Sequence, residues 1–283
     1  MTERLRRIGR FGVRRWLPAG FVLLIGILTA LGGSAGIGWP TSAQPSAAEL
    51  HALLAAPGRD RILVAFDPDV GTYAEVRPAV RAAFAQLVRA GATLSVVSFT
   101  PEGRALAVAE LDRLRRGGVE EARLLDLGFH AGAEAGLVAA TSRLVPAGAS
   151  GALAEAVRDA GGGIAAFDAV LVVGGGDIGP RSWVEQVGTR LPETTIAAIV
   201  PTSLLPQAVP YRSSGQLDAL VAGVREASAY VAAVRDDPAA SAAREAERVD
   251  DAAPSALPII AGALLLLVGL ADAIAGRWRR DAA

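Results

Sequence analysis

Acidic residues and glycines follow two apolar stretches of this sequence, at positions where they could bind a ligand. Asp67 and Asp69 come directly after the apolar run 61–66, and Gly175 and Asp177 come after the run 169–173. Carboxylates favour a cation or a hydroxyl-rich group, whereas an arginine and the amino ends of helices favour an anion. The sequence therefore does not decide whether the ligand is a cation or an anion. Alternatively, Asp67 and Asp177 bind no ligand and only cap neighbouring helices. The candidate ligand-binding residues are Asp67, Asp69, Gly175, Asp177, Arg212 and Gln216.

These residues would be positioned by an alternation of strands and helices. Nearly continuous apolar runs are typical of parallel strands covered on both faces, and glycines and prolines separate them from helical patterns. The sequence therefore predicts a Rossmann-like, three-layer α/β domain with a mostly parallel sheet of about five strands, with ligands at the carboxyl ends of the strands. The expected strands are 61–66, 93–99, 122–127, 169–173 and 195–200, and the expected helices are 77–90, 100–116, 133–142, 153–158, 181–190 and 215–234.

Two helix starts carry a local signal. Thr100 followed by Pro101 has the form of an N-cap with proline at the first helical position. Ser213 and Gln216 have the spacing of a capping box, which predicts a helix from residue 215 after a loop over 201–210. A short helix around residues 49–54 precedes the domain, and we expect His51 to lie on its surface.

The segment 174–179 matches the glycine pattern of dinucleotide-binding loops. It stands after a predicted strand and before a predicted helix, as that function requires. However, no acidic residue follows the next strand, where Val200, Pro201 and Thr202 stand, and the pattern follows the fourth strand and not the first. We therefore expect a tight turn that uses left-handed glycines, and no cofactor.

The stretch from Asp67 to Thr72 resembles the D-x-D-x-T motif of haloacid-dehalogenase-like phosphatases, with one additional residue before Thr72. The resemblance implies a nucleophile at Asp67 and a general acid at Asp69. It further implies that Ser98 or Thr100 supplies a hydroxyl group after the second strand, and that Asp177 is a magnesium ligand. It thus suggests a magnesium-dependent phosphoryl hydrolase.

A second resemblance covers most of residues 61–231. The segments 125–136, 169–187 and 210–230 are similar to a group of uncharacterised bacterial membrane-anchored proteins with an extracytoplasmic Rossmann-like domain. This resemblance implies an architecture and no activity. It directs attention to residues 128–134, 177–183 and 211–216.

Composition excludes several kinds of chemistry. The chain has no cysteine and, on inspection, no lysine, so disulfides, thiolate nucleophiles, Schiff bases and a phosphate-binding loop lysine are excluded. It has only two histidines, and we expect no metal site. The net charge of −1 gives no reason to expect nucleic acid as a partner.

Two apolar segments predict that the chain is anchored in a membrane. Residues 16–39 contain no ionisable side chain and follow six arginines, and a second segment, 255–276, precedes Arg277. Because basic residues stay on the cytoplasmic side, both termini are expected in the cytoplasm and the domain outside the plasma (inner) membrane. A cleaved signal peptide at the amino terminus is the alternative. The predicted segments are a basic tail 1–15, a span 16–39, a linker with a short helix 40–60, the α/β domain 61–235, a stalk 236–254, a span 255–276 and a tail 277–283.

The leading functional hypothesis is a membrane-anchored extracytoplasmic binding or scaffold module within a membrane-associated assembly. Its expected partners are the lipid bilayer and a protein in the membrane or outside it. The phosphoryl hydrolase on the same fold is the alternative.

The membrane topology can be tested because the chain has no native cysteine. Single cysteines at Ser46 and Ser241 should react with a membrane-impermeant maleimide in intact cells, and one at Thr2 should not, because the positive-inside rule places only the termini in the cytoplasm. The reverse labelling pattern would contradict the predicted topology.

Overall fold

The computed structural model describes residues 44–237, which lie within one compact unit. The predicted spans 16–39 and 255–276 lie outside the described residues, as do both tails. Within residues 44–237 no helix has both the length and the apolar character needed to cross a membrane.

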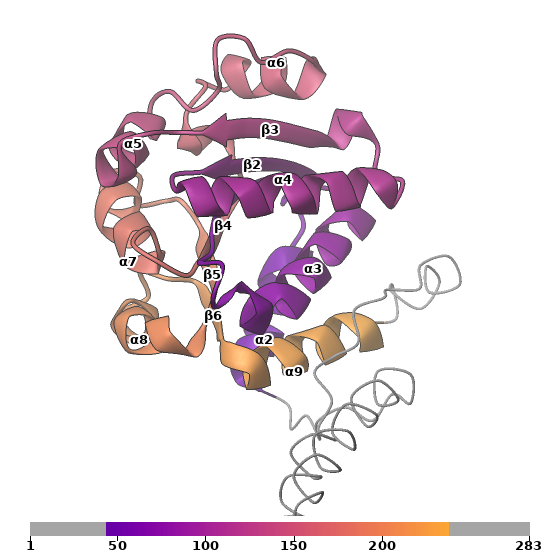
Figure 1. Cartoon of the computed structure of the whole chain (residues 1–283), viewed down its shortest axis with the longest axis vertical. Helices are drawn as coiled ribbons and strands as arrows, with labels where there is room; N and C mark the ends of the chain where they lie inside the picture. The colour runs from indigo at the N-terminus through magenta and orange to yellow at the C-terminus, as the bar shows by residue number, and fades with distance from the viewer. Residues whose placement is uncertain (1–43, 238–283) are drawn as a thin grey trace, which may run out of the picture. The chain divides into compact units, whose positions relative to one another are not determined.

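A parallel sheet of six strands forms the centre of the domain (Figure 1). The strand order is β3-β2-β1-β4-β5-β6, and each pair of neighbours is parallel. The chain builds outward from β1 to β3 and then returns to place β4 beside β1, which is the doubly wound, Rossmann-like order. The predicted α/β class and parallel sheet are confirmed, with one strand more than expected. The strands are β1 Arg61–Asp67, β2 Thr93–Ser98, β3 Leu124–Phe129, β4 Ala169–Gly174, β5 Ile196–Val200 and β6 Ala219–Ala222.

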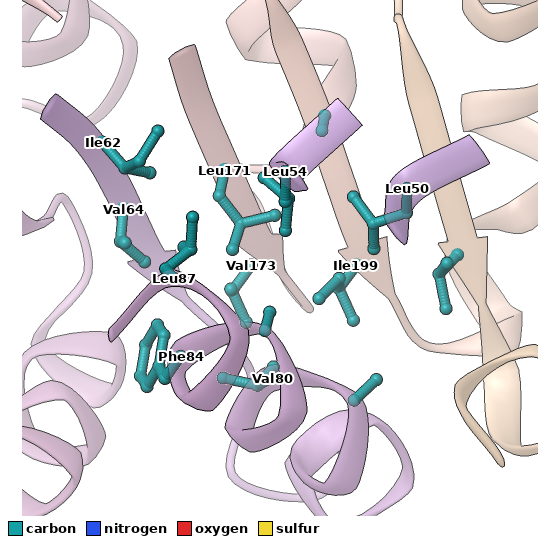
Figure 2. Close-up of a cluster of buried hydrophobic side chains, with 14 of the residues drawn as sticks. Leu50, Leu54, Ile62, Val64, Val80, Phe84, Leu87, Leu171, Val173 and Ile199 are labelled. Atoms are coloured by element: carbon teal, nitrogen blue, oxygen red, sulfur yellow. The ribbon is translucent and has the colours of Figure 1, made fainter. Parts of the chain in front are cut away.

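Helices cover both faces of the sheet because successive strand side chains point to opposite faces. In β1, Ile62 and Val64 belong to one buried cluster, and Leu63 and Ala65 belong to the other. Figure 2 shows the first cluster, where Val80, Phe84 and Leu87 of α3 lie over the sheet. This cluster is covered by α2 Pro45–Ala55, α3 Tyr73–Arg89, α4 Pro101–Arg116 and α9 Gly223–Asp236. The second is covered by α5 Ala133–Ala140, α6 Ala152–Asp159, α7 Pro180–Trp183, the π-helical turn η3 Val184–Gly188 and α8 Leu205–Ser213.

Short turns complete the fold, and several boundaries differ from the predictions. The strand predicted at 122–127 begins two residues later because a 3-10 turn takes its first positions. The predicted helix 181–190 is a short α-helix continued by the π turn η3. The N-cap prediction is confirmed, since the Thr100 hydroxyl accepts a hydrogen bond from the Gly103 amide at 3.1 Å. The 3-10 turns are η1 Glu121–Arg123, η2 Ile164–Ala166 and η4 Thr202–Leu204.

The largest correction concerns the helix predicted over 215–234. Residues Ala219–Ala222 instead form β6, which pairs with β5, and α9 begins only at Gly223. Gly223 adopts a φ of +73°, which a side chain would disfavour, and this turn separates strand from helix. The region 201–210, predicted as a loop, contains the start of α8, and Ser213 ends that helix. The predicted capping box is therefore absent.

Helix α2 packs into the core through Ala47, Leu50 and Leu54. His51, predicted to be a surface residue, is half-buried, and its Nδ1 lies 3.1 Å from Oε1 of the buried Gln86. Gln86 donates from Nε2 to the His51 carbonyl at 2.8 Å, and its Oε1 accepts from the Tyr230 hydroxyl at 2.6 Å. Because that amide oxygen can only accept, His51 Nδ1 is the donor. This network joins α2, α3 and α9.

A buried carboxylate joins α3 to α4. Glu110 accepts hydrogen bonds from Tyr73 at 3.0 Å, from Arg81 Nη2 at 2.9 Å and from Arg113 at 2.7 Å. Burial alone would raise the pKa of Glu110, but the hydrogen bonds and charges of the two arginines outweigh burial and hold the pKa below its usual range. Glu110 is therefore ionised and fully paired.

The Glu110→Gln substitution should lower the free energy of unfolding by roughly 3 kcal/mol, because it leaves two arginines without their buried partner. Chemical denaturation of the purified protein measures this change. Asp112 is the matched control on the same helix, since its side chain is 48% exposed in its ion pair with Arg115. Asp112→Asn should cost less than about 1 kcal/mol. Equal losses for the two variants would contradict the assigned role of Glu110.

Candidate functional site

A cleft of about 290 Å³ lies where the carboxyl ends of β1, β2 and β4 meet. The strand order reverses direction between β1 and β4, so the loops that follow these two strands lead away from each other and leave a crevice between them. The lining residues come from the loop after β1, the start of α4 and the loop after β4. They are Asp67, Pro68, Asp69, Val70, Thr100, Glu102, Gly176 and Asp177.

Asp67 is the last residue of β1 and is only 2% exposed. Its Oδ1 accepts three hydrogen bonds, from the Phe99 amide at 2.7 Å, the Thr100 amide at 2.8 Å and the Thr100 hydroxyl at 3.0 Å. Its Oδ2 is buried and has no hydrogen-bond partner within the described residues. Burial raises the pKa of Asp67 to about 6, and the hydrogen bonds from Phe99 and Thr100 only partly oppose this effect.

The other carboxylates of the cleft lie at its mouth. Asp69 is exposed, and its Oδ1 accepts a hydrogen bond from the Gly71 amide at 2.5 Å. Glu102 and Asp177 are also exposed, and neither carboxylate has a hydrogen bond or ion pair in the part of the chain that the structure describes. None of the lining residues is basic. The cleft therefore has a strongly acidic lining.

Glycines allow the walls of the cleft to come close together. A Cβ atom on Gly175 would overlap the backbone nitrogen of Asp69, and one on Gly174 would lie 2.9 Å from Gly179 Cα. The prediction that glycines 174–179 are left-handed is wrong, because none of them has φ in that range. Gly174 and Gly175 are instead required for close approach, and Gly175 lets the loop after β4 pack on the loop after β1.

The structure brings together Asp67, Asp69, Gly175 and Asp177 but places Arg212 and Gln216 elsewhere. Arg212 Nη2 pairs with Glu49 of α2 at 2.7 Å. Gln216 is exposed and lines a second pocket of about 450 Å³ with residues that precede β5 and β6. The reason is that α8 carries the chain from the carboxyl end of β5 back to the amino end of β6. Residues 212–216 therefore do not reach the cleft.

Other polar residues at the carboxyl ends of the strands make structural contacts. Asp126 forms a two-pronged ion pair with Arg104 at 2.5 and 2.8 Å, and the His130 ring lies 5.8 Å from that of Phe99. Thr202 donates from its amide to Glu75 at 3.0 Å. Ser98 donates to the Phe66 carbonyl at 2.9 Å. These contacts stabilise the carboxyl edge of the sheet around the cleft.

Sequence reasoning did not identify Glu102 as a cleft residue. A signal was present, because Thr100 and Pro101 mark the start of a helix directly after β2, so residue 102 must lie in its first turn at the same edge of the sheet. Glu102 faces the cleft together with Asp177, although 75 positions separate the two in the sequence.

The first two segments selected by the second resemblance, 128–134 and 177–183, contact each other. Ser182 of α7 donates to Glu134 of α5 at 3.0 Å. The third segment, 211–216, contacts the turn η3 that continues α7, because the Tyr211 hydroxyl donates a hydrogen bond to Glu185 at 2.5 Å. Trp183 is fully buried, edge-on to Phe99. These contacts hold α5, α7 and α8 together on one face of the sheet.

Residues 44–237 contain no group of three or more His, Asp or Glu side chains placed to hold a metal ion. Comparisons of the chain with protein-family models, with curated proteins and with solved structures found no match. The interpretation of the cleft therefore depends on its own geometry.

The raised pKa of Asp67 predicts a specific pH dependence of stability. Because the pKa in the folded state, about 6, lies above the usual value of 3.8, folding favours the protonated acid. The contribution of protonated Asp67 to the free energy of unfolding is fully present below about pH 4 and is lost as the pH rises through about 6. Two pKa units correspond to roughly 3 kcal/mol.

Asp67→Asn should remove this dependence. From about pH 4 to about pH 7, the free energy of unfolding of the wild type should fall relative to that of Asp67→Asn by up to roughly 3 kcal/mol. Denaturant titration at a series of pH values measures the difference. Asp69→Asn, at an exposed carboxylate in the same loop, should keep the wild-type profile. Parallel profiles for wild type and Asp67→Asn would contradict the raised pKa.

Proposed function

We propose that the protein is a membrane-anchored binding module whose α/β domain lies outside the plasma membrane and binds its ligand in the cleft between β1 and β4. The apolar segments 16–39 and 255–276 each have arginines on the terminal side, and the first of them contains no ionisable side chain; both features support the anchoring. A protein partner within a membrane-associated assembly would present or receive the ligand.

The observation that carries the proposal is the Asp67 carboxylate. Leaving a buried carboxylate oxygen without a hydrogen bond is costly, and such a group in a natural protein requires an explanation. Oδ2 of Asp67 is such an oxygen, and it belongs to a residue that lines a cleft at the topological switch point. A ligand that donates to this group, after a small shift of the lining, would supply the missing partner.

Binding fits the cleft better than catalysis does. Oδ1 of Asp67 already accepts hydrogen bonds from the Phe99 and Thr100 amides, so the carboxylate is held in place by the protein and is not free to turn toward a substrate as a nucleophile. The carboxylates that face solvent, on Asp69, Glu102 and Asp177, have no histidine or arginine beside them among the lining residues. They can attract and orient a ligand.

A magnesium-dependent phosphoryl hydrolase is the second candidate. One observation favours it, because Asp67, Asp69, Thr100 and Asp177, which the haloacid-dehalogenase-like resemblance selects, all line this cleft. Carboxylate oxygens are suitable Mg²⁺ ligands. In the described residues, however, they do not converge into a metal-binding group. Magnesium-dependent release of phosphate from an ester, abolished by Asp67→Asn, would support this candidate over the binding module.

Blocking the cleft tests the binding function. Gly176 lines the cleft, a Cβ atom there would meet nothing within 4 Å, and its φ is outside the left-handed range, so Gly176→Tyr should fill the cleft without disturbing the fold. Gly148 has the same freedom in the connection between α5 and α6, which contributes no residue to the cleft, and Gly148→Tyr is the matched control. Small molecules retained by the purified full chain should be detected by mass spectrometry after denaturation.

The wild type and Gly148→Tyr should release the same small molecule, and Gly176→Tyr should have lost at least nine-tenths of it. Thermal unfolding checks that both variants remain folded. Retention of the same molecule by a folded Gly176→Tyr variant, or no retained molecule in the wild type, would contradict a ligand site in the cleft.

A further inference from the structure

We propose that the ligand of the cleft carries an ammonium or guanidinium group, which Asp177 and Glu102 bind at the mouth above Asp67. This inference rests on the proposed function, because it names the chemical class of the ligand for the same site.

The charges of the cleft select a cation. Asp67, Asp69, Glu102 and Asp177 all line it, and no basic residue does. The arginines that follow these acids in the sequence pair with other carboxylates. Arg104, on the same helix as Glu102, pairs with Asp126. Arg181, which follows Asp177, lies 4.0 Å from Glu134 and 3.8 Å from Glu185. The exposed carboxylates of the cleft therefore have no basic residue beside them among the lining residues. A bound cation would supply the opposite charge.

A buried group independently points to a donor ligand. Oδ2 of Asp67 lacks a partner, while Oδ1 of the same carboxylate accepts three hydrogen bonds. Above a pH of about 6, where Asp67 is ionised, an anion or a group that can only accept would leave this oxygen unsatisfied. Ammonium and guanidinium groups have several N–H donors and no acceptor, so one such group can contact more than one carboxylate.

The shape of the cleft favours an organic cation over a metal ion. The described residues contain no group of three acidic or histidine side chains arranged around one point, as a metal ion would require. Carboxylates that are spread around a cleft instead suit N–H donors that point in different directions. Val70, 64% exposed, and Pro68 supply an apolar wall for a short hydrocarbon stem. The volume of about 290 Å³ limits the bound group to roughly the size of an amino-acid side chain.

The inference can be tested with agmatine, which has an ammonium and a guanidinium group. Calorimetric titration of the purified full chain in detergent measures its affinity for agmatine. Agmatine should bind saturably, and Asp177→Asn and Glu102→Gln should each weaken the affinity about tenfold, because each removes one charged hydrogen-bond acceptor. Glu193→Gln is the matched control, since Glu193 is an exposed acid that lines the other pocket, and it should leave the affinity unchanged.

Three further probes distinguish other ligand classes. Glycerol, inorganic phosphate and Mg²⁺ should show no binding to the cleft, which means no binding that the Asp177→Asn substitution removes. If one of them does while agmatine does not, the cation assignment is overturned. No saturable binding of agmatine, or binding that neither cleft variant weakens, also overturns it. The binding function itself would survive these results if Gly176→Tyr still loses the retained molecule, and it would fail separately if that variant keeps it.

Discussion

The carboxylate of Asp67 connects the end of the central strand to the start of the neighbouring helix. Phe99 and Thr100 lie between the end of β2 and the start of α4, so the sheet supplies no hydrogen-bond acceptor for their amides. Oδ1 of Asp67 accepts a hydrogen bond from both amides. Gly103 allows this contact, because a Cβ atom there would overlap the Phe66 carbonyl. An acidic side chain is thus buried at the switch point for a structural purpose. The cleft is acidic at its base for the same reason.

The walls of the cleft depend on this arrangement. With α4 fixed against β1, Glu102 in its first turn must face the loop that follows β1. The glycines after β4 then bring Asp177 against the same loop from the other side. Three segments that are distant in sequence therefore place their carboxylates around one space, and Arg104 and Arg181, which follow Glu102 and Asp177, pair with other acids. The acidity of the cleft follows from the fold and not from one acidic segment.

Most of the fold could be predicted because burial on both faces imposes a simple pattern. The apolar runs of β1, β2, β4 and β5 are long enough to be recognised as strands, and Thr100 with Pro101 marks a helix start by local chemistry alone. The strand β6 could not be predicted in this way. Leu217, Leu220, Val221 and Val224 also satisfy a helical period, and only pairing with β5 decides in favour of a strand. Two of the six candidate site residues depended on this decision. Asp67, Asp69, Gly175 and Asp177 follow from strand ends, whereas Arg212 and Gln216 were expected beside the start of a helix at residue 215 that the structure does not contain.

The network of His51, Gln86 and Tyr230 has a mechanical consequence. It joins α2 and α9, the first and last helices of the described domain, and His51 Nε2 also lies 3.5 Å from the Asp237 carboxylate at the end of α9. A chain held at both ends in a membrane would transmit tension to these two helices before any other element. The load would then act on the contact between α2 and α9, and the hydrogen bonds of the sheet would be spared. The cleft, at the carboxyl ends of the strands, would keep its shape while the two ends of the domain are pulled.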